Sequence, residues 1–306
     1  MALLIPVLFA VMCGTTDRVP LGLDIFMPGP AQSPLTVEGI GLGWRLFFDR
    51  RLSRDGSIAC ATCHDPNHGF ADERPQASGI YGRKGARNAP ALINRGYGAF
   101  FFWDGRARGL EEQVLQPILN PDEMDLPLEE AEQRTGLSRA EMARALAGYV
   151  RSIRSGDSRT DRFVGGETAS LSELEISGLQ LFRGKANCVA CHLGPSFTDE
   201  SFHNTGVAWH EGRLTDVGRA TVTGNVAHRG AFKTPTLREV AGTAPYMHDG
   251  SLATLEDVVA FYDRGGNPNP QLDPELRPLH LTPNEKTALI AFLRSLSGRI
   301  NEGCSP

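Results

Sequence analysis

Apolar residues recur at helical spacing in two stretches of the chain. One stretch runs from Thr36 to Leu52 and the other from Leu171 to Lys185, and each precedes a Cys-x-x-Cys-His pentapeptide. Two later amphipathic stretches, 147–156 and 290–298, both end at a glycine, which is a common helix stop. Each half is therefore predicted to contain a helix, the pentapeptide, a long loop region and a closing helix, repeated with a period of about 130 residues.

Neither half shows the sustained alternation of apolar and polar residues that predicts a half-buried strand. We therefore expect a mainly α fold. The stretch 156–169 is rich in Gly, Ser, Asp and Thr and is typical of a linker, so we expect domains at 21–160 and 161–306.

Residues 1–20 are expected to be an export signal or a disordered N-terminus. The apolar run 2–12 is too short to span a bilayer, but it lacks the basic residues that usually precede a signal, so a buried N-terminal strand is the alternative. Cys13 is the position for a lipid anchor, although Met12 before it fits that role poorly. Cys304 is interpreted as a lone thiol with no obvious partner except Cys13, and no role is assigned to it.

The two pentapeptides indicate covalent attachment of two c-type haems. Two thiols at this spacing can add to the two vinyl groups of one porphyrin, and the adjacent imidazole can bind the iron. Zinc sites and redox dithiols are the alternatives, but neither needs two full copies of Cys-x-x-Cys-His. The residues concerned are Cys60, Cys63 and His64 in the first copy and Cys188, Cys191 and His192 in the second.

The charge and the amino-acid composition limit the kinds of partner and fold that the chain can have. The net charge of -5 and the isoelectric point near 5.9 argue against nucleic acid. The 20 prolines and 34 glycines favour short helices separated by long loops, which is how a haem is wrapped.

Several further motifs make the chain similar to one family. They are Arg87-Asn88-Ala89-Pro90, Trp103-Asp104-Gly105-Arg106, Pro117 to Met124, Phe232 to Arg238 and Thr243 to Gly250. From Leu46 to Gly298 the chain resembles the bacterial di-haem cytochrome c peroxidase and MauG family. The resemblance implies two cytochrome c-like domains, a peroxide-binding N-terminal haem, and a C-terminal haem that donates electrons or shares charge.

The resemblance also implies roles for four residues near the first haem. Trp103 matches the tryptophan that carries charge between the haems. Gln113, Pro117 and Glu123 match residues beside the peroxide pocket, where a carboxylate can move protons between the peroxide oxygens. A core aromatic and a solvated surface carboxylate are the alternative interpretations of Trp103 and Glu123.

The sixth iron ligands distinguish the branches of the family. Where many members place a loop histidine over the first haem, this chain has Ile80, and His68 is interpreted as a structural residue, so an open iron is expected. For the second haem, Tyr262 occupies the position of the axial methionine, as in the MauG branch, with Met247 as the rival ligand. An anionic phenolate stabilises Fe(III) and higher states.

The resemblance implies a calcium ion held by Asn88, Thr243 and Pro245, with oxygen ligands that suit this hard cation. The leading hypothesis is a periplasmic di-haem enzyme that uses hydrogen peroxide to reach a bis-Fe(IV)-like state and oxidises a partner protein, such as a tryptophan side chain, without stable insertion in a membrane. Ala186 stands where MauG has its surface tryptophan, which leaves the electron exit route open. The alternatives are a cytochrome c peroxidase that takes electrons from a small cytochrome or cupredoxin, and a non-catalytic di-haem electron carrier.

Overall fold

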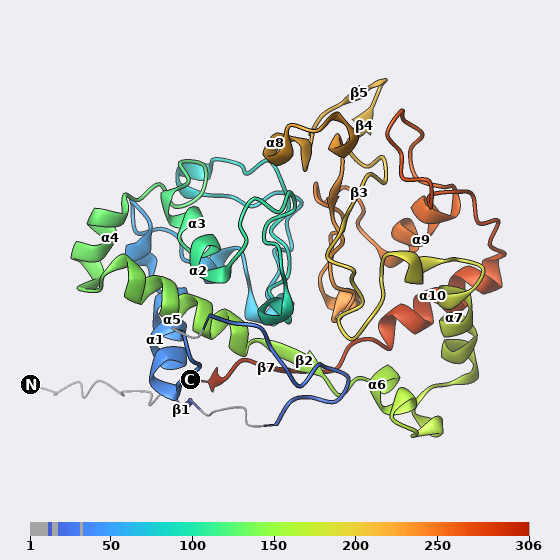
Figure 1. Cartoon of the computed structure of the whole chain (residues 1–306), viewed down its shortest axis with the longest axis horizontal. Helices are drawn as coiled ribbons and strands as arrows, with labels where there is room; N and C mark the ends of the chain where they lie inside the picture. Colours follow the sequence, from blue (N-terminus) through green and yellow to red (C-terminus); the bar gives the residue numbers. More distant parts are fainter. Residues whose placement is uncertain (1–11, 14–17, 31–32, 306) are drawn as a thin grey trace, which may run out of the picture.

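A computed structural model describes residues 12–13, 18–30 and 33–305. The described chain forms two mainly helical halves that lie side by side (Figure 1). The α-helices of the first half and of the segment that follows it are α1 (Val37–Phe47), α2 (Leu110–Gln113), α3 (Gln116–Leu119), α4 (Leu128–Thr135), α5 (Arg139–Ser152) and α6 (Arg159–Val164). Those of the second half are α7 (Glu173–Arg183), α8 (Ala220–Thr223), α9 (Leu255–Asp263) and α10 (Pro283–Arg294).

In the first half, α1 crosses α5 at very close range. Thr36 caps α1 by accepting from the backbone of Gly39, and Ser138 forms a capping box with Glu141 at the start of α5. Gly43 permits the crossing, because a Cβ atom there would lie 1.9 Å from the backbone oxygen of Ala145.

The second half repeats this crossing between α7 and α10. A Cβ atom at Gly178 would lie 2.0 Å from the backbone oxygen of Ala288. An aromatic pair also recurs, because the ring of Phe47 packs 5.1 Å from Tyr149 and the ring of Phe182 packs 5.0 Å from Phe292. The duplication predicted from the sequence is therefore present in the packing of the helices.

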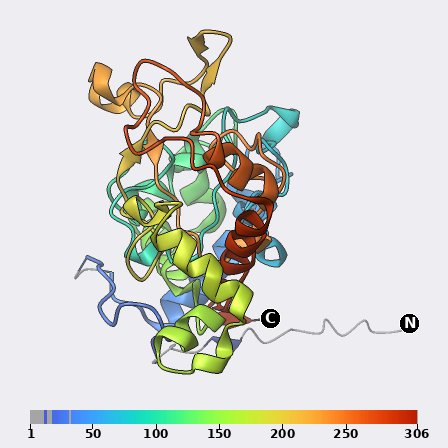
Figure 2. The same cartoon turned by 90° about the vertical axis from the view of Figure 1, so that its right-hand side faces the viewer.

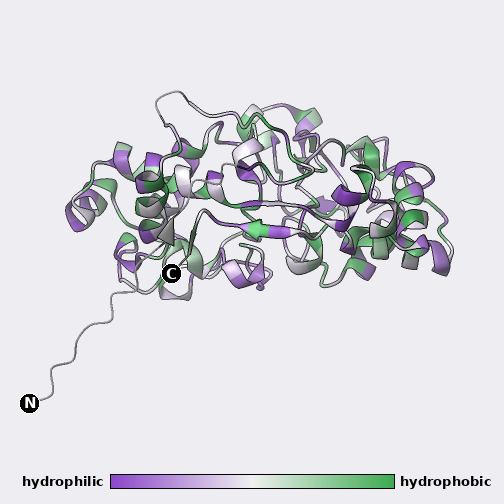
Figure 3. Cartoon of the chain, turned by 90° about the horizontal axis from the view of Figure 1, so that it is seen from below, coloured by the Kyte–Doolittle hydropathy of each residue, from purple (hydrophilic) through white to green (hydrophobic). Residues whose placement is uncertain are grey.

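Each half has its own apolar core. Apart from Cys304, the buried members of the first core lie between Ile40 and Ile153, and those of the second between Leu171 and Leu296. The helical ribbons at both ends of the molecule carry hydrophobic and hydrophilic residues in alternation along their turns, as amphipathic helices do (Figure 3). The predicted boundary near residue 160 falls between the two cores.

The stretch 156–169, predicted to be a linker, is ordered in part. It contains α6, and Asp161 of this helix forms a buried ion pair with Arg238, with Nη1 2.8 Å from Oδ2. Arg238 also donates to the backbone oxygen of Gly22 at 2.7 Å. Glycine and serine content alone does not reveal such a contact, because Arg238 lies far away along the chain.

Four short antiparallel ribbons complete the described chain. They pair β1 (Met12–Cys13) with β8 (Cys304–Ser305), β2 (Arg154–Gly156) with β7 (Arg299–Asn301), β3 (Phe202–His203) with β6 (Phe232–Lys233), and β4 (Trp209–His210) with β5 (Arg213–Leu214). The ribbon of β2 and β7 runs along the base of the molecule and returns the end of the chain to the first half (Figure 1).

The interpretation of Cys304 as a lone thiol is wrong. Cys304 is buried and disulfide-bonded, and its backbone lies opposite Cys13 in the pairing of β1 with β8. The sequence offered Cys13 as the one obvious partner, but it could not show that the two ends of the chain lie side by side. Of the possible export signal, residues 1–11 and 14–17 lie outside the described residues. Among the helices of the described chain, none is long and apolar enough to cross a membrane.

Candidate active site

The first pentapeptide forms a tight turn that presents one histidine nitrogen. Residues 60–62 form a single 3₁₀ turn, and the backbone N–H of His64 donates to the carbonyl oxygen of Cys60 at 3.0 Å. The Nδ1 atom of His64 lies 3.1 Å from the carbonyl oxygen of Phe70, so Nε2 is the ring nitrogen left to bind an iron. Burial lowers the pKa of His64, which favours the neutral imidazole that metals bind.

The second pentapeptide has the same geometry. The backbone N–H of His192 donates to Cys188 at 2.9 Å, and its Nδ1 atom lies 2.9 Å from the carbonyl oxygen of Phe197. The four cysteines of both motifs are free. Burial raises the pKa of Cys60 and of Cys188 to about 12, so these sulfurs stay protonated in apolar surroundings. Free thiols beside a neutral, oriented imidazole fit a c-type haem in each half.

Glu123 lies close to the first pentapeptide. Its charge contributes, after burial, to the raised pKa values of Cys60 and Cys63. Burial raises the pKa of Glu123 itself, against the effect of the amide of Asn120, which donates to Glu123 Oε1 at 2.6 Å. A carboxyl group in these surroundings can hold a proton closer to neutral pH than a solvated one.

The loop predicted to lack a histidine ligand contacts the backbone of Glu123. Ile80 is fully buried, and its backbone N–H donates to the carbonyl oxygen of Glu123 at 2.9 Å. Gln113 ends α2 and Pro117 lies at the start of α3, and both are half-buried in the stretch that leads to Glu123. The structure therefore brings buried Ile80 and the carboxylate of Glu123 into one region near the first pentapeptide.

Tyr262 lies near the second pentapeptide at the end of α9. Burial raises the pKa of Tyr262 above its usual value, and the nearby sulfurs of Cys188 and Cys191 raise it further. Met247 lies in a turn between Tyr246 and His248. The backbone N–H of Tyr246 donates to the carbonyl oxygen of Leu252 at 2.7 Å, and the ring of His248 stacks on Phe232. Tyr262 therefore lies near both cysteines of the second pentapeptide.

Trp103 joins the two halves through its hydrogen bonds. Its indole Nε1 donates to the carbonyl oxygen of Asn88 at 2.9 Å in the first half, and its own carbonyl oxygen accepts from the N–H of Lys233 at 2.8 Å in the second half. The backbone N–H of Asn88 in turn donates to His248 at 2.8 Å. Trp103 is thus held at the junction between the halves.

The residues predicted to hold calcium belong to segments that meet at the same junction. The side-chain nitrogen of buried Asn88 donates to the carbonyl oxygen of Arg74 at 3.0 Å, so its side-chain oxygen points the other way. His68 Nε2 lies 2.5 Å from the carbonyl oxygen of Ala244, which is flanked by Thr243 and Pro245. This contact agrees with the interpretation of His68 as a structural residue.

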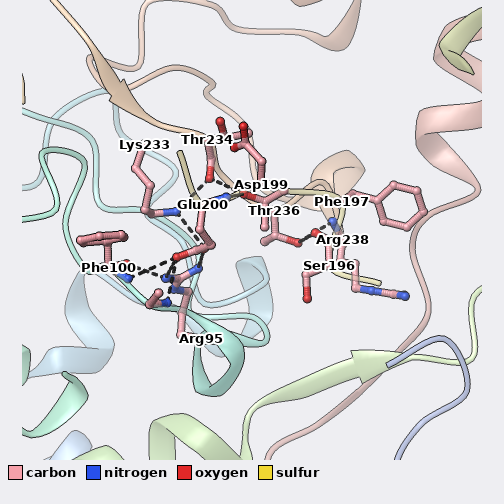
Figure 4. Close-up of polar contacts among 12 residues, drawn as sticks. Arg95, Phe100, Ser196, Phe197, Asp199, Glu200, Lys233, Thr234, Thr236 and Arg238 are labelled. Atoms are coloured by element: carbon pink, nitrogen blue, oxygen red, sulfur yellow. Dashed lines mark hydrogen bonds and ion pairs between the residues drawn. The ribbon is translucent and has the colours of Figure 1, made fainter. Parts of the chain in front are cut away.

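Sequence reasoning missed a buried charge cluster between the halves (Figure 4). Glu200 binds Arg95 at 2.8 Å and Lys233 at 3.2 Å. Burial alone would raise the pKa of Glu200, but the charges of Arg95 and Lys233 lower it to about 2. Burial lowers the pKa of Lys233 to about 8. These residues are far apart in sequence, and no local motif signals that they meet.

Two further ion clusters were also missed. Arg87 binds Asp104 and, across the junction, Asp216, each at 2.7 Å. His203 lies 2.9 Å from Asp199 and 2.6 Å from Asp273, and its pKa is raised to about 10 by Cys191 and by these two carboxylates.

Comparison with known proteins shows that the chain is similar to one group of di-haem proteins. The family model for di-haem cytochrome c peroxidase matches residues 37–138. The methylamine utilization protein MauG of Methylorubrum extorquens is 38% identical over 288 residues, which cover 88% of this chain and 81% of that protein. The cytochrome c551 peroxidase of Nitrosomonas europaea is 34% identical over 289 residues, which cover 89% and 83%.

Solved structures are similar over both halves. A MauG-like protein associated with microbial copper homeostasis has a TM-score of 0.82 and 33% identity, covering 90% of this chain and 94% of that one. The diheme peroxidase BthA of Burkholderia thailandensis has a TM-score of 0.73 and 27% identity, with 87% of each chain covered. The prediction of a mainly α fold of this family is confirmed.

Proposed function

The chain belongs to the di-haem cytochrome c peroxidase family, and on that premise we propose that it uses hydrogen peroxide to oxidise a partner protein by long-range electron transfer. Its relatives include both MauG proteins and cytochrome c peroxidases, and all of these are di-haem oxidoreductases. The observation that supports the MauG-like role is the position of half-buried Tyr262 near the cysteines of the second pentapeptide.

We propose that Tyr262 and His192 would both be ligands of the second haem iron. A phenolate stabilises oxidised iron more strongly than a thioether does, so this haem would help to hold an oxidising equivalent rather than supply an electron in advance. The haems, when bound, supply the redox chemistry. The chain supplies the ligands, the proton transfer and the route between the sites.

The first site is proposed to accept peroxide without prior reduction. Ile80 is fully buried where a loop histidine would otherwise bind the iron, and an aliphatic side chain has no lone pair to donate. Glu123 would take a proton from one peroxide oxygen and return it to the other, with Gln113 and Pro117 shaping the pocket. Its raised pKa suits a group that must both accept and donate a proton near neutral pH.

Charge is proposed to pass between the two sites through Trp103, whose hydrogen bonds reach both halves. Asn88, Thr243 and Pro245 would hold a calcium ion at the same junction and fix the relative position of the halves. Covalent haem attachment takes place outside the cytoplasm, so we place the enzyme in the periplasm.

Peroxide reduction at the expense of a small cytochrome or cupredoxin is the second candidate function. It is favoured by the similarity to cytochrome c551 peroxidase and by Ala186, which leaves no indole at the position used by MauG. A non-catalytic electron carrier would instead need both irons to be closed by protein ligands.

The test is the optical and EPR spectrum of the fully oxidised holoprotein before and after one equivalent of peroxide. We expect a high-spin ferric signal at rest and a prompt spectral change without reductant in the wild type. Tyr262→Phe should alter the product spectrum, and Glu123→Gln should slow its formation by about 100-fold or more. Asp122→Asn, which changes the exposed neighbour of Glu123, is the matched control and should react normally.

Two low-spin haems that ignore peroxide until one is reduced would overturn the MauG-like role in favour of the cytochrome c peroxidase. A protein that does not react with peroxide in either the oxidised or the half-reduced state would support the non-catalytic electron carrier.

A further inference from the structure

We propose that Trp209 is the surface relay through which the second haem site exchanges electrons with a protein partner. This inference rests on the proposed function, which requires such a route but does not say where it lies. Ala186 is 6% exposed and packs in the second core, so the position used by MauG is closed here. The chain has three tryptophans, and Trp209 belongs to the second half.

The other two tryptophans are placed elsewhere. Trp103 lies at the junction, where it donates to Asn88. Trp44 lies on α1 in the first half, with its ring 5.0 Å from that of Phe48. Trp209 is half-buried on β4, at the base of a hairpin that projects from the second half in both Figure 1 and Figure 2.

A short path of covalent and hydrogen bonds joins Tyr262 to Trp209. The carbonyl oxygen of Tyr262 accepts from the N–H of Gly265 at 3.0 Å, and two peptide bonds lead from there to Asn267. The side-chain nitrogen of Asn267 donates to the carbonyl oxygen of Gly206 at 3.0 Å, and the same oxygen accepts from the N–H of Trp209, also at 3.0 Å.

Two glycines keep this path compact. Gly206 has a φ of +83°, and a Cβ atom there would lie 2.1 Å from the backbone oxygen of Asn267. Gly266 has a φ of +72°, and a Cβ atom there would lie 2.4 Å from the backbone oxygen of Thr205. The loop after Tyr262 and the segment before Trp209 therefore pack backbone to backbone, which only glycine permits at these two positions.

The surface next to the hairpin suits contact with a protein rather than with a small polar reductant. Val217, Val222 and Val226 are 39%, 42% and 64% exposed in the segment that directly follows the hairpin. A bridge between Gly218 and Ala231 closes this segment into a compact loop. Three exposed valines in one short segment next to Trp209 would offer apolar contacts to a protein partner.

The electrons balance in two equal steps. Reduction of one hydrogen peroxide molecule to two water molecules needs two protons and two electrons, which the haem pair, when bound, would supply. Trp209 then gives one electron to the oxidised second site and recovers one electron from the partner protein, and a second such transfer restores the resting enzyme. The partner loses two electrons in total.

The first experiment needs no partner. The holoprotein is treated with excess hydrogen peroxide without reductant, and oxygen addition to tryptophan is mapped by peptide mass spectrometry. We expect oxygen on Trp209 in the wild type, little on Trp44, and loss of the Trp209 modification in Glu123→Gln. Trp209 that stays unmodified while other residues are oxidised would overturn the proposal.

The second experiment follows the return of the peroxide-oxidised protein to its resting spectrum with a small reduced c-type cytochrome. Trp209→Phe should slow this return by about tenfold or more, whereas Trp44→Phe, the matched control, should not change it. Equal rates in the two variants would overturn the relay but leave the proposed function intact. A wild type that shows no spectral change with peroxide would instead refute the proposed function.

Discussion

Replacing Gly43 by alanine tests whether the close helix crossing of the first half depends on the absence of a side chain. The added Cβ atom would lie 1.9 Å from the backbone oxygen of Ala145 and 2.8 Å from Cβ of Tyr149. Non-bonded contacts of this kind need about 3.5 Å, so α1 would have to move by more than about 1 Å, because a backbone atom cannot rotate away.

Helix propensity and overpacking change the stability of Gly43→Ala in opposite directions. Alanine favours a helix over glycine by about 1 kcal/mol, and overpacking of this severity costs about 3 kcal/mol or more. We therefore expect a net loss of about 2 kcal/mol in the free energy of unfolding, or roughly 6 °C in the melting temperature. Gly178→Ala should have a similar effect on the second half, since its Cβ atom would lie 2.0 Å from the backbone oxygen of Ala288.

Gly148→Ala is the matched control in the same crossing. A Cβ atom at Gly148 would meet only Cδ2 of Leu35, at 3.9 Å, so helix propensity should act alone and stabilise the protein by up to about 1 kcal/mol. Thermal unfolding of the holoproteins is followed by circular dichroism and by haem absorbance. A Gly43→Ala protein as stable as the wild type, or a Gly148→Ala protein as unstable as Gly43→Ala, would refute the reasoning.

Two further predictions concern the junction between the halves. The pKa of Glu200 is lowered to about 2 in the folded protein, so its contribution to stability is present above pH about 4.5 and is lost as the pH falls toward 2. Denaturant unfolding measured between these pH values should show that the free energy of unfolding falls steeply with acid in the wild type and less steeply in Glu200→Gln. Parallel pH dependences in the two proteins would contradict the lowered pKa of Glu200. If calcium is bound at the junction, a chelator should lower the melting temperature of the wild type but not that of Asn88→Ala. A chelator that leaves the wild type unchanged would exclude the calcium site.

The sequence by itself determined the features that depend on short spacing. Two thiols and an imidazole within five residues specify a haem attachment turn, and the repeated spacing of apolar residues predicted the duplicated helices and the mainly α fold. The family motifs also carried Trp103, Glu123 and Tyr262 as candidates, and the structure places all three at the junction or beside the pentapeptides.

Only the tertiary structure decided which distant residues meet. Glu200 binds Arg95 across about 100 positions of sequence, and Cys304 pairs in a ribbon with the other end of the chain. The path from Tyr262 to Trp209 exists only because two glycine-containing loops pack backbone to backbone. Local patterns cannot encode such contacts, because each of them depends on how two separately folded segments are brought together.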